Sequence, residues 1–150
     1  FYSIDYPPEV CRTVQQTARR LHLPVYILFT GNKTYRALPY GFRLARHQTP
    51  GDVVALVKGA KLVLSTSFHG TVFALRFGTP FYALKAKRGA AYYTDPRIAT
   101  LLQTAGVAER YLPCDRAGEI NTAPLHRDPA LLDRAVAESR AFLQEGLTAR

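Results

Sequence analysis

The chain has 150 residues, of which 47% are hydrophobic and 21% charged, a composition typical of one folded globular domain. No stretch approaches the roughly 18 consecutive apolar residues that a membrane span needs, and the first residues lack the basic-then-apolar order of a signal peptide. Lys and Arg outnumber Asp and Glu by 20 to 11, and the formal charge of +9 predicts an anionic partner such as a phosphorylated metabolite, a lipid diphosphate, a membrane surface or nucleic acid.

Some residue types are rare or missing. The sequence has no Met, so we expect a processed product or, the favoured reading, a piece of a longer polypeptide. Cys11 and Cys114 match neither a zinc spacing nor a dense disulfide framework, and we interpret them as small packing residues, with a single disulfide as the alternative. No metal-binding cluster is visible. Because no zinc-finger or RNA-binding signature accompanies the basic residues, nucleic acid is not the expected partner. The lack of a membrane span and of a signal peptide in the sequence favours a cytoplasmic setting.

The first third of the chain predicts a helix, a strand and a loop. Apolar residues at helical spacing indicate a helix from about Glu9 to His22. The apolar run 25–29 then predicts a buried strand, which we expect to be one of the central strands of the sheet. Residues 31–48 are rich in Gly, Asn, Pro and Arg, so we expect an irregular surface loop with a short strand near 43–47.

A second helix is predicted from its capping residues. Thr49 is the expected N-cap, with Pro50 at the first helical position and Asp52 reaching back as in a capping box. We expect its buried face to consist of Val53, Leu56, Val57 and Ala60.

The middle of the chain predicts a compact βαβ unit. Residues 61–66 read as a strand, 67–70 as a turn and 71–77 as a helix that ends at Gly78. Another strand follows over 80–84. A crossover of this kind joins parallel strands, so the two strands should pair in parallel.

Two further helices complete the prediction. Asp95 caps one, and the closing helix begins near Asp128 and is expected to pack along the domain. Alternating helices and strands predict a single α/β domain over residues 1–150, a Rossmann-like parallel sheet with helices on both faces.

The turn at 67–70 is the candidate site. Ligands of open parallel sheets bind beyond the carboxyl ends of the strands, where helix N-termini attract anions. There Gly70 would allow close approach of a ligand, and His69 can exchange a proton near neutral pH. Hydroxyl groups come from Ser65, Thr66, Ser67 and Thr71.

These residues carry a resemblance. Residues 62–73 and 77–81 are similar to the signature of the polysaccharide pyruvyl transferase family. The stretches 50–60, 95–102 and 132–143 also resemble that family, so that the likeness covers most of residues 50–145 in the family's order. Residues 1–49 agree only in general pattern.

The resemblance implies an architecture and an activity. Family members are two-lobed and resemble GT-B glycosyltransferases, which would make this chain the carboxyl-terminal lobe, without its amino-terminal partner. Their reaction transfers the enolpyruvyl group of phosphoenolpyruvate to a sugar as a pyruvate ketal and needs no other cofactor. The acceptor would be a cell-surface polysaccharide or its lipid-linked oligosaccharide precursor, handled in the cytoplasm, with peripheral contact at the inner membrane face as an option. The lobe alone is expected to be inactive on sugars.

The resemblance also implies roles for residues. His69 is the expected catalytic residue, either as donor of a proton to the methylene carbon or as an aid to phosphate departure. The residues around it would bind substrate, namely Ser67, Phe68, Gly70 and Thr71. Some members have an arginine where this chain has Ser67, so the cation facing phosphoenolpyruvate must come from elsewhere. Arg97, Arg88, Lys85 and Lys87 are the candidates.

Other interpretations stay open. His69 could be a structural cap, and the run 85–88 a solvated loop. For the whole chain, the alternatives are a glycosyltransferase lobe that uses a nucleotide sugar, and a non-catalytic module that binds anions.

Overall fold

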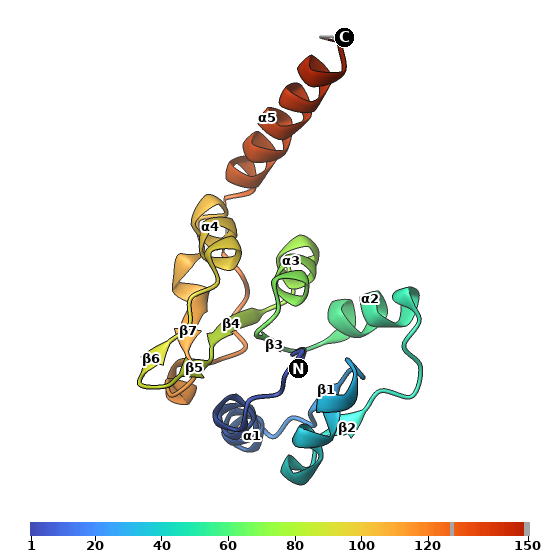
Figure 1. Cartoon of the computed structure of the whole chain (residues 1–150), viewed down its shortest axis with the longest axis vertical. Helices are drawn as coiled ribbons and strands as arrows, with labels where there is room; N and C mark the ends of the chain where they lie inside the picture. The colour runs from blue at the N-terminus through green and yellow to red at the C-terminus, as the bar shows by residue number, and fades with distance from the viewer. Residues whose placement is uncertain (127, 149–150) are drawn as a thin grey trace.

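A computed structural model describes residues 1–126 and 128–148, which form an α/β domain around a parallel sheet (Figure 1). The central sheet has the strand order β3 (Val63–Ser65), β4 (Phe81–Lys85) and β7 (Tyr111–Pro113). All its pairings are parallel, with Val63 opposite Phe81 and Ala83 opposite Tyr111. The parallel pairing predicted for the strands at 61–66 and 80–84 is therefore confirmed.

The strand predicted at 25–29 lies outside this central sheet. It is shortened to β1 (Tyr26–Ile27) and pairs in parallel with β2 (Arg43–Leu44). The amino-terminal residues occupy the free edge of β3 instead: Tyr2 donates to the carbonyl of Leu64 at 2.9 Å and accepts from Thr66 at 3.1 Å. The prediction of a central strand at 25–29 was wrong because residues 1–2 take that position.

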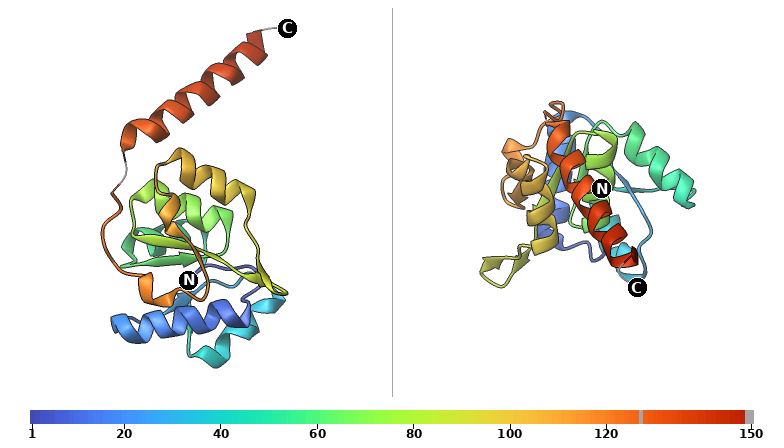
Figure 2. Two further views of the ribbon diagram at one scale, coloured as in Figure 1. Left: turned by 90° about the vertical axis from the view of Figure 1, so that its left-hand side faces the viewer. Right: turned by 90° about the horizontal axis from the view of Figure 1, so that it is seen from above.

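Helices cover both faces of the sheet, as predicted. Alternate strand residues point to opposite sides, so Leu64, Tyr82 and Leu84 belong to one core and Val63, Phe81 and Ala83 to the other. Helix α1 (Pro8–Leu21) packs on the first face, and α3 (Phe68–Phe77) and α4 (Pro96–Thr104) pack on the second (Figure 2).

The predicted helix starts agree with the structure, with one shift. The capping box of α2 (Pro50–Gly59) is present, because Thr49 and Asp52 exchange side-chain and backbone hydrogen bonds. Asp95 caps α4, and Gly78 ends α3 with a φ of 67°. Helix α3, however, starts at Phe68, so residues 68–70 form its first turn rather than a separate turn.

The loop regions contain short elements, most of which the sequence did not predict. The 3₁₀ helix η1 (Asn32–Tyr40) lies within the expected irregular loop, and β2 has two residues where we expected a strand over 43–47. Strand β7 was missed. The remaining elements are the hairpin β5 (Lys87–Arg88) and β6 (Ala91–Tyr92) and the 3₁₀ helices η2 (Ala108–Arg110) and η3 (Ala117–Glu119).

Two helices pack less than expected. None of the residues of α2 is buried, and Leu56, on its predicted buried face, is 36% exposed. Helix α5 (Pro129–Thr148) does not lie along the domain but projects from it beside α4 (Figures 1 and 2). Its Phe142 is 75% exposed. The prediction for α5 was wrong, and that for α2 holds only in part, since Val57 and Ala60 are half-buried against the second core while Leu56 is exposed. Helical periodicity shows which face is apolar but not whether anything covers it. No helix within residues 1–126 and 128–148 has the length and apolar character of a membrane span.

Gly70 should be essential for the packing of α3 on β3. A Cβ atom at this position would lie 2.5 Å from Ser65 Oγ and 2.6 Å from Tyr2 Cδ1. We expect Gly70→Ala to lower the free energy of unfolding by about 1–3 kcal/mol, measured by urea denaturation, since overpacking displaces neighbours.

Gly59→Ala is the matched control, because a Cβ at Gly59, at the end of α2, would meet no atom within 4 Å. It should leave stability unchanged or raise it by about 0.5–1 kcal/mol. Equal effects of the two substitutions would contradict the packing role of Gly70.

Candidate functional site

The site begins where β3 ends and α3 starts. Ser67 is the N-cap of α3 but makes no side-chain capping bond, and the first bond of the helix runs from the Thr71 amide to the Ser67 carbonyl at 3.1 Å. The amides of Phe68, His69 and Gly70 precede that bond and have no hydrogen-bond acceptor among the described residues. A free helix N-terminus of this kind attracts anions.

An arginine from a second helix lies beside this turn. The guanidinium carbon of Arg97 is 5.4 Å from the centre of the Phe68 ring, and the Phe68 and His69 rings meet edge to face at 5.8 Å. His69 and Arg97 are both exposed. The structure thus brings three predicted site residues, from two helices, onto one surface.

Arg97 is held by Asp95. Its Nε and Nη2 atoms donate to the two carboxylate oxygens of Asp95 at 3.1 and 2.7 Å, and Asp95 also accepts from the Arg97 amide at 2.9 Å. This hydrogen bonding lowers the pKa of Asp95 and raises that of Arg97. Asp95 is buried, so it fixes the guanidinium against the protein, and the remaining N–H groups of Arg97 stay available to a ligand.

Tyr111 connects Asp95 to Lys85. The amide of Asp95 donates to the Tyr111 hydroxyl at 2.8 Å, and Lys85 Nζ lies 4.7 Å from the centre of the Tyr111 ring. Burial is the main cause of the raised pKa of Tyr111. Sequence reasoning missed the orienting roles of Asp95 and Tyr111. An acidic N-cap two residues before an arginine was the available signal for Asp95, and Tyr111 offered none.

Arg88 lies on a separate arm. The β5–β6 hairpin continues from β4 and carries Arg88 at 3.7 Å from the centre of the Tyr93 ring. Tyr92 donates a hydrogen bond to Asp115, which raises the pKa of Tyr92 to about 12 and ties the hairpin to the segment after β7. No contact among the described residues joins Arg88 to His69.

The remaining predicted residues build the turn from inside. Ser67 and Thr71 are buried, and Thr71 Oγ1 donates to the Ser67 carbonyl at 2.9 Å. The side chains of Ser65 and Tyr2 pack directly against Gly70, so packing explains why this position is a glycine. Contact of these three residues with a substrate stays a prediction.

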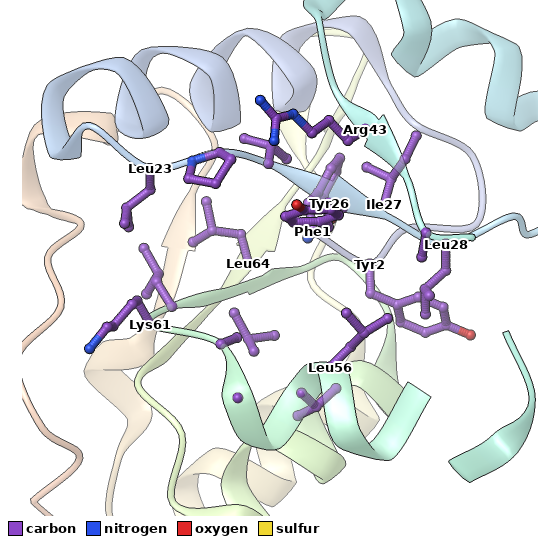
Figure 3. Close-up of a pocket in the computed structure, with 18 of the residues that line it drawn as sticks. Phe1, Tyr2, Leu23, Tyr26, Ile27, Leu28, Arg43, Leu56, Lys61 and Leu64 are labelled. Carbon is purple, nitrogen blue, oxygen red and sulfur yellow. Dashed lines mark hydrogen bonds between the residues drawn. The ribbon is translucent and has the colours of Figure 1, made fainter. Parts of the chain in front are cut away.

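A large cavity lies elsewhere. A cavity of about 970 Å³ opens between α1, the β1–β2 pair, α2 and β3, and neither His69 nor Arg97 lines it (Figure 3). Among the described residues, no three His, Cys, Asp or Glu side chains gather as metal ligands would.

The Asp95–Arg97 pair should make the free energy of unfolding depend on pH in the acidic range. Because the pKa of folded Asp95 lies below its ordinary value of about 3.9, the unfolded chain binds more protons in this range. The stabilisation that ionised Asp95 gives is complete at pH values above the ordinary pKa and is lost as the pH falls through the lowered pKa of the folded state. We expect Asp95→Asn and Arg97→Gln each to reduce the loss of stability between neutral and strongly acidic pH, measured by urea denaturation.

Part of the acid sensitivity should survive in both variants, because Thr49 also lowers the pKa of Asp52 by hydrogen bonding. A wild-type pH profile in Asp95→Asn would show that this pair does not contribute.

The comparison with known proteins agrees with the resemblance found in the sequence. The model of the polysaccharide pyruvyl transferase family matches residues 11–87, from α1 to the start of the β5–β6 hairpin. The match includes residues 11–49, which had agreed only in general pattern, and it ends before Arg97 and the closing helix. No curated protein and no solved structure matches the chain. Because the match spans more than half of the sequence and includes the His69 turn, the chain belongs to the polysaccharide pyruvyl transferase family.

Proposed function

We propose that this chain binds phosphoenolpyruvate at the surface formed by the first turn of α3 and the start of α4, and acts in a ketal-forming pyruvyltransferase. The supporting observation is the contact of Phe68 with both His69 and Arg97 beside three free amides. The family match covers the α3 part of this surface.

The proposed binding follows from the charges of the donor. Phosphoenolpyruvate carries a phosphate and a carboxylate, which free helix amides and a guanidinium bind by charge-assisted hydrogen bonds. Arg97 supplies the guanidinium that is absent at Ser67, and Lys85 adds a second positive charge nearby. Arg88, on its hairpin arm, is assigned to outer contacts with the substrates.

The reaction requires transfers of protons. The methylene carbon of phosphoenolpyruvate gains a proton, and a sugar hydroxyl attacks the adjoining carbon and loses its own proton. A second hydroxyl then displaces phosphate from that carbon and also loses its proton, which closes the ketal. His69 is the group on this surface suited to donate the first proton or to assist phosphate departure, because imidazole exchanges protons near neutral pH. Acid–base catalysis of this kind typically contributes about 10²- to 10⁴-fold.

The family resemblance supports a wider setting for the reaction. We propose that the chain is the donor-binding, carboxyl-terminal lobe of a two-lobed GT-B-like enzyme and that the acceptor enters between the lobes. The acceptor would be a polysaccharide or its lipid-linked precursor, at the cytoplasmic face of the membrane. This lobe alone should bind phosphoenolpyruvate weakly and form no ketal.

Calorimetry distinguishes this function from the glycosyltransferase alternative. Free amides and a guanidinium would also bind the diphosphate of a nucleotide sugar, so the chain is titrated with phosphoenolpyruvate and with a nucleoside diphosphate. We expect tighter binding of phosphoenolpyruvate, weakened by Arg97→Ala and unchanged by Arg140→Ala, a loss of positive charge on the distant helix α5. Preference for the nucleotide would favour the glycosyltransferase.

His69→Ala and Arg97→Ala should affect different kinetic steps in the two-lobed enzyme. We expect His69→Ala to lower turnover by about 10²-fold or more with a modest change in affinity. Arg97→Ala should act mainly on affinity, since loss of a charge-assisted bond costs about 1.5–3 kcal/mol. Steady-state kinetics measure both, with His126→Ala as the control for loss of an exposed imidazole. Near-normal turnover of a stable His69→Ala enzyme would reduce His69 to a structural cap.

A further inference from the structure

The cavity between α1, the β1–β2 pair, α2 and β3 is an open groove that separates two parallel sheets. Strands β1 and β3 lie on its two sides, so the β1–β2 pair and the central sheet are parted along it (Figure 3). Its volume is about 970 Å³. The backbone groups and side chains around the groove indicate what fills it.

Residues 1–2 already bridge the groove at one end. The amino nitrogen of Phe1 donates to the carbonyl of Tyr26 in β1 at 2.6 Å. The next residue, Tyr2, bonds to the other side, to Leu64 and Thr66, and runs parallel to β3. Successive residues of a strand direct their backbone groups to alternate neighbours. Residues 1–2 therefore have the hydrogen bonding of a strand between β1 and β3, and the gap at this end is one strand wide.

Beyond this bridge, both sides of the groove offer unpaired backbone groups. Val63 donates to the β4 side, so the amide of the next residue, Leu64, points to the groove. The carbonyls of Val25 and Ile27 accept from β2, so the amide of Tyr26 between them also points to the groove. Neither amide has an acceptor among the described residues. A strand supplies acceptors at the required spacing on both sides, which a lipid or another apolar small molecule lacks.

The side chains above and below the groove define the composition of such a strand. Side chains of a strand alternate between the two faces of its sheet. On one face the groove is lined by α1, with Val14, Ala18 and Leu21, and on the other by α2, with Val53, Leu56, Val57 and Ala60. Both faces are apolar, so a strand in the groove would be a nearly continuous apolar run, as is typical of strands inside a parallel sheet.

The position of Phe1 identifies the occupant. Its backbone lines the groove, so a residue joined to its nitrogen would lie between β1 and β3. Burial lowers the pKa of the Phe1 amino group to about 5, whereas a peptide amide at this place would carry no charge.

We propose that the groove holds a β-strand formed by the polypeptide that precedes Phe1 in the two-lobed enzyme, parallel to β1 and β3. That such a polypeptide exists rests on the proposed function. The strand would join the two sheets into one parallel sheet with the order β2, β1, the new strand, β3, β4 and β7.

Two extended chains test the strand. One carries Val-Ile-Val-Ile-Val joined to Phe1 and the other Gly-Ser-Gly-Ser-Gly, each after the same Met, so both lose the charge at Phe1. Hydrogen exchange of the Leu64 and Tyr26 amides, followed by NMR, should be about tenfold or more slower in the Val/Ile chain than in the Gly/Ser chain. The reason is that only apolar side chains fill both faces of the groove.

Substitutions inside and outside the groove provide the matched control. In the Val/Ile chain, Leu56→Asp places a carboxylate among the side chains that line the groove and should abolish the slower exchange. Leu38→Asp introduces the same charge at an exposed leucine of η1, outside the groove, and should leave the exchange slow.

The two-lobed enzyme gives a second measurement. By mass spectrometry, residues 24–28 and 62–66 should exchange more slowly in it than in the 150-residue chain. Equal exchange of the Leu64 amide in the two extended chains would overturn the proposal. So would protection in the two-lobed enzyme without protection in the Val/Ile chain, because another part of the enzyme would then cover the groove. Phosphoenolpyruvate binding is measured separately by calorimetry, so its absence would count against the proposed function and not against the strand.

Discussion

Helix α3 can start directly against strand β3 because Gly70 has no side chain. Ser65 of the strand and Tyr2 of the amino-terminal segment both occupy the space that a Cβ atom at Gly70 would need. The backbone of Tyr2 is also hydrogen-bonded along β3, so the strand, the helix and the amino-terminal segment meet at one point. This contact keeps the first turn of α3 at the carboxyl end of the sheet, where His69 is exposed. The position of His69 depends on it.

The positive charges of the site are restrained by neighbouring groups. Arg97 is fixed by Asp95, Lys85 lies over Tyr111, and Arg88 lies over Tyr93. Each contact limits the freedom of a long side chain before any ligand binds, which reduces the entropy cost of binding. The pairing of Arg97 also offsets part of its charge. The net charge of +9 predicts an anionic ligand, whereas the contacts of Asp95 and Tyr111 determine where Arg97 and Lys85 present positive charge.

Features encoded by neighbouring residues could be predicted from the sequence. The β3–α3–β4 unit, its parallel pairing and the capping by Thr49 and Asp95 depend on local signals, and all are present. Features that depend on distant residues could not. The edge of β3 is occupied by residues 1–2, which no periodicity indicates, and β7 is too short to stand out. The Asp95–Arg97 side-chain pair requires the geometry of the first turn of α4, whereas the sequence showed only the cap.

Helix α2 lies between the groove and the helix that carries the site. On one side its carbonyl at Val57 accepts a hydrogen bond from Thr79 at 3.0 Å, and Lys58 lies over the ring of Phe77, so it is tied to the carboxyl end of α3. Its other side lines the groove. Val57 and Ala60 are half-buried against the core on the α3 side, so α2 separates the groove from α3. The free amides and His69 lie at the opposite end of α3, so the groove is separate from the surface that we propose as the substrate site.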